Sequence, residues 1–186
     1  MNWHVIFVET GYEDEVCYYI DDAFHSMFSD IDYQLLVPKR KIYERKQGVR
    51  REVIRNLFPG YILIETDQIL DFYIRIKGRP RVYKILRDYD YFYTVGPEEM
   101  HRILNLTDDD GLIDISEAFY INDRVQIMNG PLWGKEGIIK KIDKRKGRAK
   151  VEFSIDKKPY MVDLGIRILP VMSDLYQAEI MEESFI

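Results

Sequence analysis

The chain has 186 residues, with 27 Lys and Arg against 32 Asp and Glu, and a formal net charge of -5. An apolar content of 46% with 13% aromatic residues can build a core, which excludes a disordered or collagen-like chain and predicts one or two domains. The single cysteine, Cys17, excludes an intramolecular disulfide and a cage of thiolate metal ligands.

The N-terminal residues lack the features of a targeting segment. The apolar run 3–8 has no basic region before it and is followed at once by Glu9, so no signal peptide is predicted. No uncharged stretch reaches about 18 residues, so no membrane-spanning helix is predicted. We expect a cytoplasmic protein with no membrane partner.

Charge is strongly segregated along the chain. Residues 1–37 hold eight acids and no Lys or Arg, whereas residues 38–58 hold eight bases and two acids. Residues 96–119 hold seven acids and one base, and residues 120–170 hold twelve bases and six acids. Because charges are screened beyond roughly 8–10 Å at physiological salt, a polyanion would meet each basic region locally.

The first hundred residues mix strand and helix patterns. Apolar residues at spacings of three and four, after three acids, predict an amphipathic helix from Glu13 to Phe28. A Pro-Gly bend at 59–60 leads into a fully apolar strand, Asp67 is expected to cap a short helix, and Pro97 opens another. Further strands are expected at 3–8, 33–37 and 82–86, with a basic hairpin around residues 47–48. This order predicts an α+β layer of helices against a small sheet.

The last third of the chain has a different pattern. An acidic stretch, residues 107–118, is the predicted linker. Short alternating runs at 124–127, 137–142, 148–153, 160–162 and 166–169, separated by turn residues, predict a small β-barrel over residues 119–172. So small a barrel should need all of its apolar strand residues in its core, namely Val125, Ile127, Ile138, Val151, Phe153 and Leu169. Residues 173–186 form an acidic tail.

Catalytic and metal-binding patterns are absent from the sequence. His4, His25 and His101 lie far apart with no His-x-x-x-His pair, and no nucleophile elbow, Walker motif or dinucleotide fingerprint occurs. We expect a protein that is not an enzyme and that uses no metal or cofactor. A deep pocket with converging ionisable groups would argue otherwise.

Two segments resemble a known family. Residues 57–64 (Leu-Phe-Pro-Gly-Tyr-Ile-Leu-Ile), after a strand that bears Trp3 and an amphipathic helix, resemble the signature of the N-terminal NGN domain of NusG-type transcription elongation factors. Residues 123–139 (Asp-Arg-Val-Gln-Ile-Met-Asn-Gly-Pro-Leu-Trp-Gly-Lys-Glu-Gly-Ile-Ile) resemble the KOW motif that opens their C-terminal SH3-like barrel. The resemblance spans about residues 2–170. It implies an α+β chain with an antiparallel N-terminal sheet flanked by helices, residues 1–106, and a small KOW barrel.

The resemblance implies a polymerase-binding surface on the N-terminal domain. In this family that domain lays an apolar surface on RNA polymerase. The candidates here cluster around the Pro-Gly bend and the first strand: Phe7, Phe58, Pro59, Gly60 and Tyr61. Such a role needs exposed rings, because aromatic anchors in pockets are the usual hot spots. The alternative is that the rings are ordinary core residues.

The first basic segment, residues 39–55, would then face nucleic acid. Phosphate pairing by Lys and Arg supplies salt-sensitive affinity that does not depend on sequence. With the resemblance, we interpret it as a contact with non-template or upstream DNA; without it, a solvated face is favoured. The candidates are Lys39, Arg40, Lys41, Arg45, Lys46, Arg50 and Arg51.

The second basic segment, residues 140–150, is expected at a hairpin tip of the barrel. Its density of bases is greater than in a housekeeping NusG and resembles that of specialised antiterminators of the LoaP type, which favours nascent RNA, such as a hairpin, as the partner. The candidates are Lys140, Lys141, Lys144, Arg145, Lys146, Arg148 and Lys150, with Trp133 as a base-stacking or protein-anchoring residue. The alternative for Trp133 is a capped barrel rim.

The predicted function is that of a monomeric transcription elongation factor that binds RNA polymerase and promotes processive antitermination. One alternative is a housekeeping NusG-type pausing or termination factor whose barrel binds Rho or a ribosomal protein. Another is a translation-associated RNA-binding KOW protein, although such a protein would not need the N-terminal domain.

Overall fold

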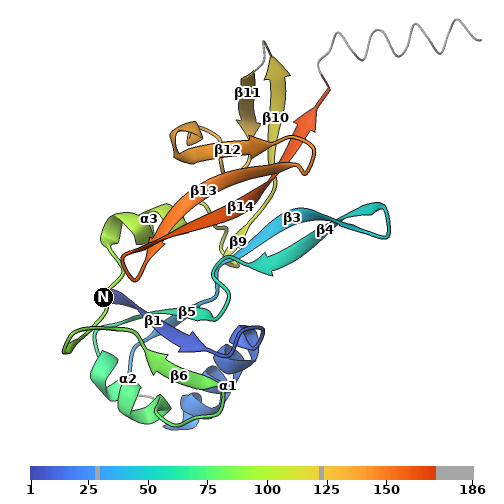
Figure 1. Ribbon diagram of the computed structural model, residues 1–186. Coiled ribbons are helices and arrows are strands. Elements are labelled where there is room, and N and C mark those ends of the chain that lie inside the picture. Colours follow the sequence, from blue (N-terminus) through green and yellow to red (C-terminus); the bar gives the residue numbers. More distant parts are fainter. Residues whose placement is uncertain (28–29, 122–123, 171–186) are drawn as a thin grey trace, which may run out of the picture. The chain divides into compact units, whose positions relative to one another are not determined.

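A computed structural model describes residues 1–27, 30–121 and 124–170. Its elements, in chain order, are β1 (Asn2–Val8), α1 (Glu13–Met27), β2 (Gln34–Leu36), β3 (Lys39–Lys46), β4 (Val49–Asn56), β5 (Tyr61–Thr66), α2 (Ile69–Ile76), β6 (Val82–Ile85), β7 (Arg87–Asp88), β8 (Tyr91–Phe92), α3 (Pro97–Leu104), β9 (Leu112–Ile113), β10 (Ser116–Ile121), β11 (Arg124–Asn129), the 3-10 helix η1 (Glu136–Ile138), β12 (Ile139–Asp143), β13 (Arg148–Ile155) and β14 (Lys158–Leu169) (Figure 1). The predicted tail at 173–186 lies outside the described residues.

The chain divides into two compact units that do not follow the chain order. Unit 1 comprises Met1–Lys39, Arg55–Leu112 and Phe153–Tyr160. Unit 2 comprises Arg40–Ile54, Ile113–Glu152 and the described part of Met161–Ile186. Residues 107–118, where a linker is predicted, carry β9 and the start of β10. The predicted domain boundaries at residues 106, 118 and 172 stay a prediction.

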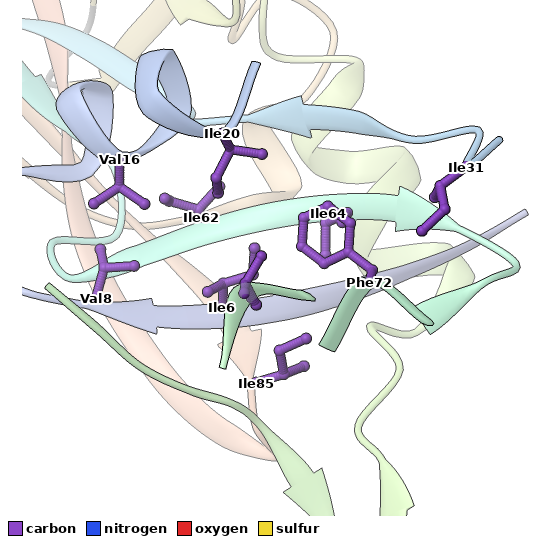
Figure 2. Close-up of a cluster of buried hydrophobic side chains, with 10 residues drawn as sticks. Ile6, Val8, Val16, Ile20, Ile31, Ile62, Ile64, Phe72 and Ile85 are labelled. Atoms are coloured by element: carbon purple, nitrogen blue, oxygen red, sulfur yellow. The ribbon is translucent and has the colours of Figure 1, made fainter. Parts of the chain in front are cut away.

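Unit 1 is built on a four-stranded sheet with the order β2-β5-β1-β6 and antiparallel pairing throughout. Helices α1 and α2 cover one face of this sheet (Figure 1). Alternate strand residues such as Ile6 and Ile64 point to that face and pack against Ile20 of α1 and Phe72 of α2, all of them buried (Figure 2). Strand β5 is buried on both faces, as its apolar run predicts, and it carries the Pro-Gly bend at its start.

The C-terminal strands form a five-stranded sheet with the order β11-β10-β14-β13-β12. Strand β10 pairs antiparallel with β11 and parallel with β14, and β12 pairs antiparallel with β13. Together with the helix-covered sheet of unit 1, this arrangement confirms the predicted fold class. One detail differs, because the two expected strands at 160–162 and 166–169 are a single strand, β14.

The basic hairpin forms where it is predicted. Strands β3 and β4 belong to a three-stranded sheet with β9, and Gln47 and Gly48 between them both have positive φ, of 52° and 80°. Two successive residues of this kind are the signature of the tight turn that matches strand twist. Most of this hairpin, Arg40–Ile54, belongs to unit 2.

Candidate functional site

A buried carboxylate holds the Pro-Gly bend in place. Glu13, at the start of α1, is only 1% exposed. Its Oε1 accepts a hydrogen bond of 2.5 Å from the Gly60 N–H, and its Oε2 accepts one of 2.9 Å from the Gly11 N–H. Gly60 has a φ of +86°, and a Cβ there would lie 3.0 Å from Thr10 Oγ1 and 3.3 Å from a ring carbon of Phe7. The bend therefore requires glycine and a charged acceptor beneath it.

An aromatic face lies beside this bend, and we define it as Phe7, Tyr61 and Tyr83. The ring centroid of Phe7 is 5.5 Å from that of Tyr61 and 5.2 Å from that of Tyr83. Phe7 and Tyr61 are half-buried, whereas Tyr83 is 60% exposed. Burial, with a further contribution from the hydrogen bond to Tyr160, raises the pKa of Tyr61 to about 12. The aromatic face is open on the Tyr83 side.

The expectation that Phe58 is exposed is wrong. Its side chain is 1% exposed, with its ring centroid 5.5 Å from that of Phe153 and 6.0 Å from that of Tyr160. Both contacts are edge-on, the favoured geometry for aromatic pairs. Phe153, expected in the barrel core, instead belongs to unit 1 with residues 153–160. Of the polymerase-binding candidates at the bend, Pro59 is exposed and Gly60 is buried.

Tyr83 was missed by the sequence analysis, and the reason is a β-bulge. Phe7 pairs with Lys84 and Val8 pairs with Val82, so Tyr83 is the extra residue between them. In a β-bulge the side chain of the extra residue no longer follows the regular alternation of side chains between the two faces of the sheet. Alternation within residues 82–86 could not have shown that Tyr83 meets Phe7.

The first basic segment divides into a paired part and an open part. Lys39 forms an ion pair of 2.8 Å with Asp14, Lys41 forms one of 2.8 Å with Asp114, and Arg40 donates a hydrogen bond to the Asp163 carbonyl oxygen. The residues nearer the hairpin tip are exposed; they are Arg45, Lys46, Arg50 and Arg51. The tip residues are therefore the ones accessible to a polyanion.

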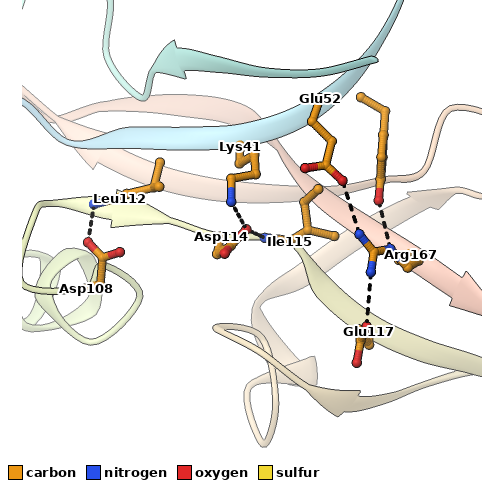
Figure 3. A network of polar contacts seen from close by, with 9 residues as sticks. Lys41, Glu52, Asp108, Leu112, Asp114, Ile115, Glu117 and Arg167 are labelled. Atoms are coloured by element: carbon orange, nitrogen blue, oxygen red, sulfur yellow. Dashed lines mark hydrogen bonds and ion pairs between the residues drawn. The ribbon is translucent and has the colours of Figure 1, made fainter. Parts of the chain in front are cut away.

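Acids of the predicted linker take part in this pairing. Figure 3 shows Lys41 directed at Asp114, and Arg167 between Glu52 and Glu117. Partial burial alone would raise the pKa of Asp114, but the hydrogen bond from Lys41 and the backbone hydrogen bond from Ile115 outweigh it and hold the pKa below its ordinary value. The acidic residues here neutralise bases of their own unit.

The second basic segment forms strand β12, a turn and the start of β13. Four of its bases have partners: Lys144 Nζ lies 3.0 Å from the Tyr120 ring centroid, and three others form ion pairs, Lys146 with Asp143 at 3.9 Å, and Arg148 and Lys150 with Asp163 at 3.2 and 3.7 Å. Lys140, Lys141 and Arg145 are exposed. A backbone hydrogen bond from Lys146, with the charges of Lys146, Arg145 and Lys141, lowers the pKa of Asp143. The turn is therefore a region of positive potential.

Trp133 lies on a loop that its buried neighbour Leu132 fixes in place. Leu132 is fully buried, and its N–H donates a hydrogen bond of 3.0 Å to Ser116 Oγ. Trp133 is 66% exposed, so its indole is accessible to a base or to a protein surface. This exposure fits the binding prediction better than the barrel-rim alternative.

The structure brings the tips of the two basic segments together, which the sequence analysis did not foresee. A cavity of about 480 Å³ in unit 2 is lined by Tyr43, Glu44, Arg45, Arg50, Arg145, Lys146 and Arg148. Tyr43 was missed because a tyrosine inside a basic strand has no distinctive local signal. Its backbone oxygen accepts a hydrogen bond of 2.9 Å from Arg148, and the Arg50 guanidinium lies 3.6 Å from its ring centroid.

His4 is buried with its Nδ1 2.9 Å from the Tyr93 carbonyl oxygen, and burial lowers its pKa. Among the described residues, no group of three His, Cys, Asp or Glu side chains is placed to hold a metal ion. Within the same ranges, no helix has the length and apolar character needed to cross a membrane.

Comparison with known proteins identifies relatives along most of the chain. The chain is 28% identical over 166 residues to the transcription termination/antitermination protein NusG of Pasteurella multocida, covering 87% of this chain and 90% of that protein. It is 27% identical over 161 residues to the protein of the same name from Bacillus subtilis, covering 81% and 86% of the two chains.

A solved structure shares the fold. It is described as "Domain interaction in Thermotoga maritima NusG", with a TM-score of 0.53, 21% sequence identity, and coverage of 88% of this chain and 93% of that one. A family model described as "Transcription termination factor nusG" matches residues 1–104, more than half of the chain. This chain therefore belongs to the NusG family.

Proposed function

We propose that this chain is a cytoplasmic transcription elongation factor that binds RNA polymerase through the aromatic face and promotes processive antitermination, with its second basic segment on nascent RNA. Membership of the NusG family supports the transcription role. The observation that carries the polymerase contact is the open aromatic face, because partly exposed neighbouring rings on a rigid sheet are typical protein-binding anchors.

The aromatic face suits a protein partner better than a nucleic acid. Tyr61 and Tyr83 flank Phe7 at centroid distances of 5.2–5.5 Å, so the rings form one apolar surface with hydroxyl groups at its margin. Lys84, next to Tyr83, is exposed and would lie at the rim. An apolar centre with a polar margin is the usual anatomy of a protein interface.

Nucleic acid is the proposed partner of the basic residues. The exposed bases of the hairpin tip, with Arg51 on β4, are the proposed DNA contacts, and the exposed Lys140 and Lys141 are the proposed contacts with transcript; their exposure supports both assignments. Contacts with polymerase and nucleic acid on one chain raise each other's effective concentration, so neither contact has to be tight alone.

Polymerase affinity tests the aromatic face. Replacing Tyr83 with Ala in the full chain, alone and together with Tyr61→Ala, is expected to weaken binding to purified RNA polymerase by about tenfold or more, because a lost hot-spot ring is worth about 2 kcal/mol or more. The measurement is the dissociation constant at fixed salt concentration, by fluorescence anisotropy of labelled protein.

The matched control is Tyr91→Ala. Tyr91 is 79% exposed and lies on β8, outside the aromatic face, so its removal deletes the same side chain without touching the proposed contact. Equal affinities for the Tyr83 and Tyr91 variants would remove the aromatic face from the interface. Circular dichroism of each variant separates lost contact from lost folding.

The alternative of a pausing or termination factor makes a different prediction for unit 2. In that case the exposed Trp133 would anchor Rho or a ribosomal protein, and Trp133→Ala would weaken that complex while leaving RNA affinity unchanged. The exposed bases of the second basic segment favour RNA, because accessible cations pair with phosphate, whereas a protein partner does not require them.

A further inference from the structure

The cavity in unit 2 joins two hairpins that lie about a hundred residues apart in the sequence. Arg148 Nη2 donates a hydrogen bond of 2.9 Å to the Tyr43 carbonyl oxygen, and Arg167 Nε donates one of 3.0 Å to the Tyr43 hydroxyl. At Gly147, φ is +66°, and a Cβ would collide with the Arg50 guanidinium and lie 3.2 Å from the Tyr43 ring. The β12–β13 turn and the β3–β4 hairpin are therefore packed directly against each other.

The cavity has a large excess of positive charge. Five of its seven lining residues are cationic, and Glu44 is the single carboxylate among them. In the part of the chain that the structure describes, the side chains of Arg45 and Arg145 make no hydrogen bond and no ion pair. Like charges held this closely repel one another, so the arrangement favours an anion that enters between them.

Two of the lining arginines are held in place by the protein. Arg50 stacks on the Tyr43 ring, and Arg148 is fixed by Asp163 and by the Tyr43 carbonyl oxygen. The Nε of Arg148 is buried and has no hydrogen-bond partner among the described residues. Fixed guanidinium groups lose little entropy on binding and pair with phosphate in a defined geometry.

The size and continuation of the cavity indicate a chain of phosphates. About 480 Å³ accommodates one or two nucleotides, within the usual range for ligand pockets. Beyond the lining residues, exposed bases continue along both hairpins, with Lys46 and Arg51 on one and Lys140 and Lys141 on the other. A looped single strand can bend its backbone into a concave site of this kind. Duplex DNA has a regular backbone and is instead contacted along its own grooves.

We propose that this cavity binds the phosphate backbone of a looped RNA segment, with the β3–β4 hairpin and the β12–β13 turn as two halves of one site. Arg45 and Arg50, assigned above to DNA with the other bases of the hairpin tip, are thereby reassigned to the RNA site. This inference rests on the proposed function, because it gives the proposed RNA contact a location and adds the β3–β4 hairpin to it.

Paired substitutions in the full chain test the composite site. Arg45→Gln and Arg145→Gln are each expected to weaken binding of a fluorescein-labelled RNA hairpin by about threefold to tenfold, and to reduce the slope of log affinity against log salt by about 0.7. Arg124→Gln is the matched control, because Arg124 is exposed on β11 in unit 2 and does not line the cavity. The DNA hairpin of the same sequence and a duplex DNA are measured in parallel.

The outcomes are distinguishable. Similar losses for Arg45→Gln and Arg145→Gln on RNA, with no loss for Arg124→Gln, support one composite site. A loss for Arg145→Gln alone overturns the composite site and leaves the proposed RNA contact of the barrel intact. No binding of the RNA hairpin by the unsubstituted chain overturns both. Losses confined to duplex DNA, or displacement of the RNA by polyglutamate as effective as by unlabelled RNA, overturn the assignment to RNA.

Discussion

Replacing Phe58 with Ala is expected to lower the free energy of unfolding of unit 1 by about 3–5 kcal/mol, the usual loss for a buried phenylalanine. Phe58 is 1% exposed and is enclosed by edge-on contacts with Phe153 and Tyr160, so truncation removes buried apolar area and leaves a cavity. The effect should appear in the absence of polymerase. That separates a core role from the interface role that the position of Phe58 beside the bend suggests.

Tryptophan fluorescence during urea unfolding measures this loss. The chain has two tryptophans, so in a Trp133→Phe background the buried Trp3 of β1 reports unit 1 alone. Tyr89→Ala is the control, since Tyr89 is 93% exposed and its removal should change stability by less than about 0.5 kcal/mol. A Phe58→Ala protein as stable as this control would contradict the assignment of Phe58 to the core.

Replacing Glu13 with Ala is expected to destabilise unit 1 by about 2–4 kcal/mol. The substitution removes a charged acceptor from the Gly60 N–H, which is buried and would then have no partner. Glu13→Gln keeps one oxygen acceptor, so its free energy of unfolding should lie between those of the unsubstituted protein and Glu13→Ala. In both variants the Gly60 amide should exchange with solvent faster, which NMR hydrogen exchange detects residue by residue.

Glu15→Ala is the matched control for this experiment. Glu15 lies in the same first turn of α1 and pairs at 2.7 Å with Arg81, but it is solvent-exposed. Its loss removes the same charge from the helix start and should change stability by less than about 1 kcal/mol. Equal losses at Glu13 and Glu15 would mean that the helix start, not the bend, determines the effect.

The sequence predicted those parts of the fold that depend on neighbouring residues. The helix from Glu13 and the helix that opens at Pro97 form as expected, and the hairpin turns at Gln47 and Gly48. Each of these features depends on periodicity, a helix start or turn chemistry, all of which act over a few residues. They could therefore be predicted without knowledge of the sheet.

The errors arose where distant segments decide the structure. Asp67 is the expected cap of α2, but the cap residue is Gln68, whose Oε1 accepts a hydrogen bond of 3.1 Å from the Asp32 N–H, while Asp67 lies 3.7 Å from the N-terminal amine. Strand β14 runs unbroken through Gly165, because it lies between β10 and β13 in the sheet. Neither contact has a local signal.

The candidate site shows the same division. Segregated charge marks both basic segments as continuous runs of residues, but only the packing of the β12–β13 turn against Tyr43 shows that their tips line one cavity. An aromatic residue beside a bend fits a core and an interface equally well. For Phe58 the choice is made by residues 153–160, nearly a hundred positions further along the chain.

Whether the protein acts as an antiterminator is measured by transcription with purified RNA polymerase on a template with an intrinsic terminator, with and without the full-length protein. We expect stable association with the elongation complex and increased read-through, both reduced by the combined Tyr61→Ala and Tyr83→Ala substitutions and unaffected by Tyr91→Ala. Neither association nor any change in termination, with a folded protein, would contradict the proposed function.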